Sequence, residues 1–256
     1  MSEWRWADAV RVLGLVVAAS FVVAAVLQAV LSFELTGAAP PDKPDFIDTI
    51  VAFFTWEEGR NPIDFAASAL VALGFIALGG VGAMLARLAS AFDARRTLIS
   101  LTMVAGAILG ATSQLWWIGV KGVAVDPHYC DCGFRAEEIT SRLMALRIAG
   151  SVQTWLLIGG IVATSIGVLL AVRLVRRPGI SSGWVWLSYL LLIASLLASF
   201  VAAAEIDPFD QYGTLLVAGI LIPAWALWLA IEAPKLEAPG LMAGEVPPEP
   251  TSVIGG

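Results

Sequence analysis

The stretch AVRVLGLVVAASFVVAAVLQAVLSF, residues 9–33, decides the fold class of this chain. Beyond Arg11, its only polar interior side chains are Ser20 and Gln28. An α-helix rises about 1.5 Å per residue, so the run is long enough to cross the roughly 30 Å of hydrocarbon in a bilayer. It is also longer than the roughly 7–15 apolar residues of a secretory signal. The stretch therefore predicts an uncleaved first membrane-spanning helix.

The composition of the whole chain points to the same class. Hydrophobic residues make up 59% of the chain and charged residues 14%, whereas soluble domains average about 45–50% and about 25%. The net charge of -6 is modest and does not suggest nucleic acid as a partner. Two cysteines are too few for a disulfide framework.

Five further runs resemble the first in length and apolar character. Together they predict spans at residues 9–33, 62–88, 98–120, 148–172, 184–204 and 208–231. None of them alternates apolar and polar residues, and lipid demands that each segment pair its own backbone groups, so helices are expected. The predicted fold is an all-α bundle of six transmembrane helices over residues 1–233. A disordered Pro/Glu-rich cytoplasmic tail is expected over residues 234–256.

The orientation in the membrane follows from the basic residues beside the spans. The short connectors 91–97 and 173–183 are strongly basic. Basic residues in short connectors stay in the cytoplasm. We therefore expect both termini in the cytoplasm and the chain in the plasma (inner) membrane.

The outer connectors show helical patterns of their own. The apolar spacing over residues 46–56 predicts a short helix in the headgroup plane, and residues 134–147 predict a second short amphipathic helix. The sequence Asn61-Pro62-Ile63-Asp64 is typical of a helix start, which would place the beginning of the second span there. Asp207-Pro208-Phe209-Asp210 repeats the arrangement before the sixth span.

The soft metal ligands of the chain gather in one outer connector. His128, Cys130 and Cys132 alternate there, so an extended strand would place all three on one face. They can hold zinc or copper if Asp126 or Asp131 completes the ligand set. A Cys130–Cys132 disulfide and a pair of unreactive thiols are the competing interpretations.

Polar and small residues inside the spans are the remaining candidates. Gln114 and Gln153 lie toward the outer halves of adjacent helices, where they can bond each other or line a substrate site. Four glycines allow close helix packing, within the bundle or toward another subunit: Gly106, Gly110, Gly159 and Gly160. Pro223 should kink the sixth helix.

No sequence motif points to an enzyme. The chain has no Ser-His-Asp set, zinc-protease motif or phosphate-binding glycine loop, and a single His excludes bis-histidine haem ligation. We expect no catalytic residue and no cofactor. The main hypothesis is an accessory subunit or scaffold whose partners are membrane lipids and other membrane protein subunits. The alternatives are a small-molecule or lipid transporter or binding protein, and an outer-face redox or metal protein centred on residues 128–132.

Overall fold

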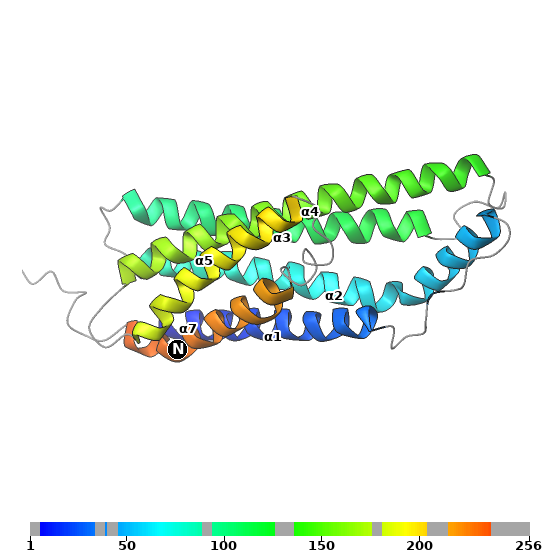
Figure 1. The fold of residues 1–256 in the computed structure, drawn as a ribbon. Coiled ribbons are helices and arrows are strands. Elements are labelled where there is room, and N and C mark those ends of the chain that lie inside the picture. Colours follow the sequence, from blue (N-terminus) through cyan, green and yellow to red (C-terminus); the bar gives the residue numbers. More distant parts are fainter. Residues whose placement is uncertain are drawn as a thin grey trace, which may run out of the picture.

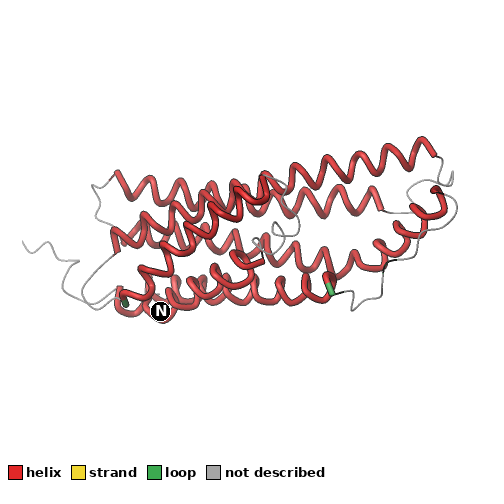
Figure 2. The backbone as a smooth tube through the Cα atoms, in the orientation of Figure 1, coloured by secondary structure: helices red, strands yellow, loops and turns green. Residues whose placement is uncertain are grey.

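The computed structural model describes residues 6–33, 39, 46–88, 94–125, 136–175, 181–203 and 215–236. Helices account for nearly all of this part of the chain (Figures 1 and 2). They are α1 (Trp6–Ser32), α2 (Phe46–Leu88), α3 (Ala94–Val125), α4 (Ala136–Val175), α5 (Ser182–Ala203), the π-helical η1 (Leu215–Leu221) and α7 (Ile222–Leu236).

The predicted fold class is confirmed. Within the described residues, six helical segments are long and apolar enough to cross a membrane, with η1 and α7 counted as one. The protein is therefore a multi-pass membrane protein. In Figure 1 the helices run lengthwise beside one another. We call the end that holds the N-terminus the proximal end. The distal end holds the last residues of α1 and α3 and the first residues of α2 and α4.

The helices pack in a ring that follows the chain. α2 packs between α1 and α3, α4 packs between α3 and α5, and α7 closes the ring against α1 and α5. Phe21 meets Phe75 edge-on at a centroid distance of 5.4 Å, which joins α1 to α2. The Trp225 ring stacks on Trp184 at 5.8 Å, and its Nε1 donates to Ser188 Oγ at 2.8 Å. These contacts attach α7 to α5.

The predicted helix break at Asn61-Pro62 is wrong. α2 continues through Pro62 as one helix of 43 residues, so the short helix expected over residues 46–56 is the first part of α2. Likewise, the described part of the segment 134–147 belongs to the 40-residue helix α4. At about 1.5 Å per residue these helices measure roughly 60–65 Å, about twice the hydrocarbon thickness. Part of each of these helices therefore extends beyond the hydrocarbon.

α2 bends near Pro62. Figure 1 shows α2 changing direction between its blue first part and its cyan remainder. Pro62 lacks the N–H that would bond to the carbonyl of Glu58, and its ring crowds that preceding turn. Sharp bends in helices usually have this cause. Pro62, which the sequence pattern places at the start of a helix, therefore bends α2 within its length.

The glycines that the sequence singled out pack α3 against α4 and α2. A Cβ on Gly106 would lie 2.8 Å from the carbonyl oxygen of Gly160, and one on Gly160 would lie 2.7 Å from the amide nitrogen of Gly110. Gly110 also faces the ring of Phe75, while Gly159 faces Leu109. Because backbone meets backbone here, larger side chains would separate the helices.

The last span is irregular where the sequence predicts a kink. The π-helical segment Leu215–Leu221 ends immediately before α7, and Pro223 is the second residue of α7. Single-turn π segments are a known source of helix irregularity. The predicted helix start at Asp207-Pro208 and the tail over residues 237–256 lie outside the described residues.

Candidate functional site

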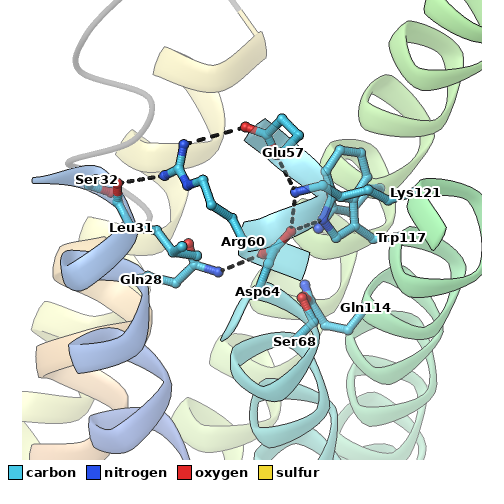
Figure 3. Close-up of a pocket in the computed structure, with 11 residues that line it drawn as sticks. Gln28, Leu31, Ser32, Glu57, Arg60, Asp64, Ser68, Gln114, Trp117 and Lys121 are labelled. Atoms are coloured by element: carbon cyan, nitrogen blue, oxygen red, sulfur yellow. Dashed lines mark hydrogen bonds and ion pairs between the residues drawn. The ribbon is translucent and has the colours of Figure 1, made fainter. Parts of the chain in front are cut away.

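A polar cavity of about 570 Å³ lies between four helices toward the distal end (Figure 3). Its lining comes from α1 (Gln28, Leu31, Ser32), α2 (Glu57, Arg60, Asp64, Ser68), α3 (Gln114, Trp117, Lys121) and α4 (Gln153). Only Leu31 has a purely apolar side chain. Such a lining stands out in a chain that is 59% hydrophobic.

Helical spacing gathers these side chains on the inner faces of α2 and α3. The α2 residues follow one another at intervals of three or four, and so do those of α3. At about 3.6 residues per turn, such intervals place side chains on one helix face. The cavity therefore exists because α2 remains helical across Pro62. Had the helix started there, Glu57 and Arg60 would belong to a loop.

Lys121 is the centre of an ion-pair network. Its Nζ lies 2.7 Å from Asp64 Oδ2 and 2.8 Å from Glu57 Oε2. The side chains of Lys121 and Asp64 are only 9% and 10% exposed. A charge that is removed from water must be paired, because the desolvation cost is several kcal/mol per ion. The network meets this requirement by pairing each charge with an opposite one.

Asp64 connects three helices. Its Oδ1 accepts a hydrogen bond from Gln28 Nε2 of α1 at 3.2 Å. Its Oδ2 accepts from Trp117 Nε1 at 3.1 Å, in addition to the ammonium of Lys121, both on α3. Figure 3 shows these groups converging on the carboxylate. The sequence pattern instead suggests that Asp64 lies at the surface, in the first turn of a helix.

Arg60 joins the same network to the end of α1. Its Nη2 donates to the carbonyl oxygen of Leu31 at 2.6 Å, and its Nη1 lies 3.4 Å from Glu57 Oε1. The guanidinium also lies over the Trp56 ring, 4.0 Å from the centroid. Carbonyls in the last turn of a helix lack intrahelical partners, so Arg60 caps α1. Its Nε is buried and has no hydrogen-bond partner among the described residues.

The depth of the cavity follows from helix lengths. Asp64 lies roughly 24 residues, or about 36 Å, from the proximal end of α2, and Gln28 lies about 33 Å from the start of α1. The hydrocarbon of a bilayer is about 30 Å thick. The cavity therefore lies about one hydrocarbon thickness along the bundle from the proximal helix ends.

The two glutamines predicted inside the membrane both line this cavity. Gln114 is buried, and its Nε2 donates to Ser113 Oγ at 3.2 Å. Gln153 contributes the α4 wall. His128, Cys130 and Cys132 lie outside the described residues. Within the described ranges, no group of three or more His, Cys, Asp or Glu side chains is placed to hold a metal ion.

Sequence reasoning misses the four charged residues of the cavity. It assigns Glu57, Arg60 and Lys121 to connectors and Asp64 to the first turn of the second span, because Asn61-Pro62 resembles a helix start and Lys121 follows the end of an apolar run. A signal for them is nevertheless present. Glu57-x2-Arg60-x3-Asp64 and Gln114-x2-Trp117-x3-Lys121 share one helical spacing.

Among known proteins, no family model, curated protein or solved structure matches the chain. Evidence for a function therefore comes from the cavity and its charges.

Proposed function

We propose that this multi-pass membrane protein binds a small polar molecule, or the polar headgroup of a lipid, in the cavity between α1, α2, α3 and α4. The observation that carries the proposal is the polar lining of a cavity of about 570 Å³. We place this cavity at a membrane–water boundary, because it lies about one hydrocarbon thickness from the proximal helix ends. Ligand sites typically measure about 300–1,000 Å³. Charged groups at helix positions facing a membrane-protein interior usually mark such sites, because they are costly to place there.

The packing of the glycines removes one argument for the role of an accessory subunit or scaffold. The sequence allows Gly106, Gly110 and Gly160 to pack either within the bundle or toward another subunit. In the structure they contact α2, α3 and α4 of the same chain. Packing within the bundle therefore explains why these positions lack side chains. The metal or redox alternative rests on His128, Cys130 and Cys132, which lie outside the described residues.

We also propose that the cavity faces the outside of the cell, with both termini in the cytoplasm of a plasma (inner) membrane protein. The basic connectors 91–97 and 173–183 support this orientation. Both join helix ends at the proximal end of the bundle (Figure 1). The ligand would then reach the cavity from the outer solution or from the outer leaflet.

A cavity-filling variant tests the binding function. Gln153→Trp adds a large ring to the α4 wall, whereas Thr154→Trp adds the same ring at the next residue, which is exposed. Each protein is purified in mild detergent, and its retained lipids and metabolites are quantified by mass spectrometry. We expect the wild type and Thr154→Trp to retain a ligand that Gln153→Trp loses. Equal retention of a ligand in all three proteins would contradict the proposal.

A further inference from the structure

The formal charges of the cavity cancel. Arg60 and Lys121 contribute two positive charges, and Glu57 and Asp64 contribute two negative charges. All four are paired with one another at distances between 2.7 and 3.4 Å. A ligand with a net charge would leave one charge without compensation in a site that is largely removed from water. The charge balance therefore favours a ligand whose own net charge is zero.

The cationic half of the network has donors to spare. The Nε of Arg60 is buried without a hydrogen-bond partner among the described residues. Its Nη1 reaches Glu57 only at 3.4 Å, a long distance for a charge-assisted hydrogen bond. Lys121 divides its ammonium protons between two carboxylates. An anionic group that displaced the long Arg60–Glu57 contact would therefore find donors on both cations.

The carboxylates of Glu57 and Asp64 can change their cationic partners when a ligand binds. When an anionic ligand group engages Arg60 and Lys121, the carboxylates of Glu57 and Asp64 lose part of their compensation. A ligand ammonium restores it, so every buried charge keeps an opposite neighbour. An anion alone leaves a carboxylate unpaired, and a cation alone leaves Arg60 or Lys121 unpaired. An uncharged polar ligand can hydrogen-bond to the four charged groups, but it cannot take the place of a charged partner.

We infer that the ligand is a zwitterion, whose phosphate or carboxylate binds Arg60 and Lys121 and whose ammonium binds Glu57 and Asp64. This inference rests on the proposed binding function and names the chemistry of the ligand. Such a ligand has two sources, a free zwitterionic solute or a zwitterionic lipid headgroup. The position of the cavity at the membrane boundary suits both.

Two matched sets of compounds test the charge requirement on the full-length protein in phosphatidylglycerol nanodiscs. The first set is glycerophosphoethanolamine, glycerol 3-phosphate, ethanolamine and glycerol. The second is 4-aminobutyrate, butyrate, butylamine and butanol. Binding is measured by isothermal titration calorimetry. We expect the zwitterion of at least one set to bind at least about tenfold more tightly than its three relatives.

The source of the zwitterion is decided by a lipid arm of the same experiment. Nanodiscs are prepared with and without phosphatidylethanolamine. If the natural ligand is a lipid headgroup, phosphatidylethanolamine competes with the soluble zwitterion, and native mass spectrometry shows it retained by the protein. If the ligand is a free solute, affinity for the soluble zwitterion is the same in both nanodiscs. Either result supports zwitterion binding.

Charge variants provide a readout that simple loss of folding does not produce. Lys121→Met gives the cavity a net negative charge, so preference should move toward ethanolamine or butylamine. Asp64→Asn gives it a net positive charge, so preference should move toward glycerol 3-phosphate or butyrate. The double variant Asp64→Asn with Lys121→Met restores a net charge of zero and should regain the zwitterion preference. Lys235→Met, at the other end of the bundle, should leave the order of preference unchanged.

The outcomes separate this inference from the proposed function. If the wild type prefers an anionic, cationic or uncharged compound, the zwitterion is wrong but the cavity still binds a ligand. The same conclusion applies if none of the compounds binds while Gln153→Trp still loses a retained molecule of another chemistry. If no compound binds and Gln153→Trp changes nothing, both proposals fail. Unchanged preference in Lys121→Met and Asp64→Asn would also overturn the inference.

Discussion

Lys121 places its ammonium nitrogen 2.7 Å from Oδ2 of Asp64, although 57 residues separate the two in the chain. The contact joins α3 to α2 beside the bend at Pro62. Both side chains are about nine-tenths buried. A pair of this kind contributes little when compared with a well-packed apolar pair, but it is strongly destabilising to break, because one charge is left behind. The contact is therefore a sensitive point for mutation.

Breaking the pair from one side should destabilise the protein. Lys121→Met leaves the carboxylates of Asp64 and Glu57 without their shared cation, and we expect a loss of about 3–5 kcal/mol in the free energy of unfolding. Asp64→Asn should also be destabilising. The measurement is reversible unfolding in mixed micelles. The double variant should cost less than the sum of the single variants, because it leaves fewer unpaired charges. Additive losses would contradict the ion pair.

The close contact of α3 and α4 predicts the effect of a larger side chain. Gly106→Leu would push a side chain into the backbone of Gly160, so we expect a loss of about 1–3 kcal/mol or more. Adding Gly110→Leu should increase the loss. Gly119→Leu, on the same helix but with nothing within 4 Å, is the matched control and should be neutral or stabilising. Equal thermal stability of Gly106→Leu and Gly119→Leu would show that this packing is absent.

The bend in α2 should depend on Pro62. Pro62→Ala restores an N–H donor and removes the ring, so α2 should straighten without loss of stability. Spin labels at the exposed positions Thr55 and Leu73 would report the change by electron paramagnetic resonance. We expect a longer distance in the variant and weaker ligand binding, because Glu57 and Arg60 move relative to Asp64. An unchanged distance distribution would show that packing alone bends the helix.

The proposed orientation predicts which side of the membrane each end of the bundle occupies. In a protein whose Cys130 and Cys132 are replaced by Ser, Ser182→Cys should react with an impermeant maleimide only from the cytoplasm. Gly59→Cys, at an exposed distal position, should react from outside intact cells. Reaction of Ser182→Cys only from outside would reverse the topology.

The cysteines of the connector after α3 should form a disulfide if that connector faces an oxidising compartment. Mass spectrometry of the non-reduced protein should then show a two-hydrogen deficit in the peptide that contains Cys130 and Cys132. Two freely alkylatable thiols would rule out the disulfide. Thiols that react only after a chelator is added would indicate a metal site, with His128 as the first ligand to replace, since thiolate ligands and a disulfide exclude each other.

Local properties of the sequence were enough to determine the fold class. The run from residue 9 to residue 33 predicts a membrane helix because hydrocarbon thickness sets its length and lipid requires internal backbone pairing. Each of the other five spans follows from the same argument, which needs no knowledge of neighbouring helices. The small residues at 106 and 110 likewise indicate close packing, since their effect depends only on missing side-chain volume.

Only the tertiary structure decided where α2 begins and which charges meet. Asn61-Pro62-Ile63-Asp64 is compatible both with a helix start and with a bend inside a longer helix, because proline is tolerated at the first helical turn and also bends helices in which it is embedded. Asn61 and Asp64 are buried in the structure, so the bundle provides surroundings that an exposed helix start would lack. Lys121 meets Asp64 only because α3 packs beside α2. The pairing depends on how the faces of α2 and α3 meet, so it cannot be predicted from the sequence of either helix alone.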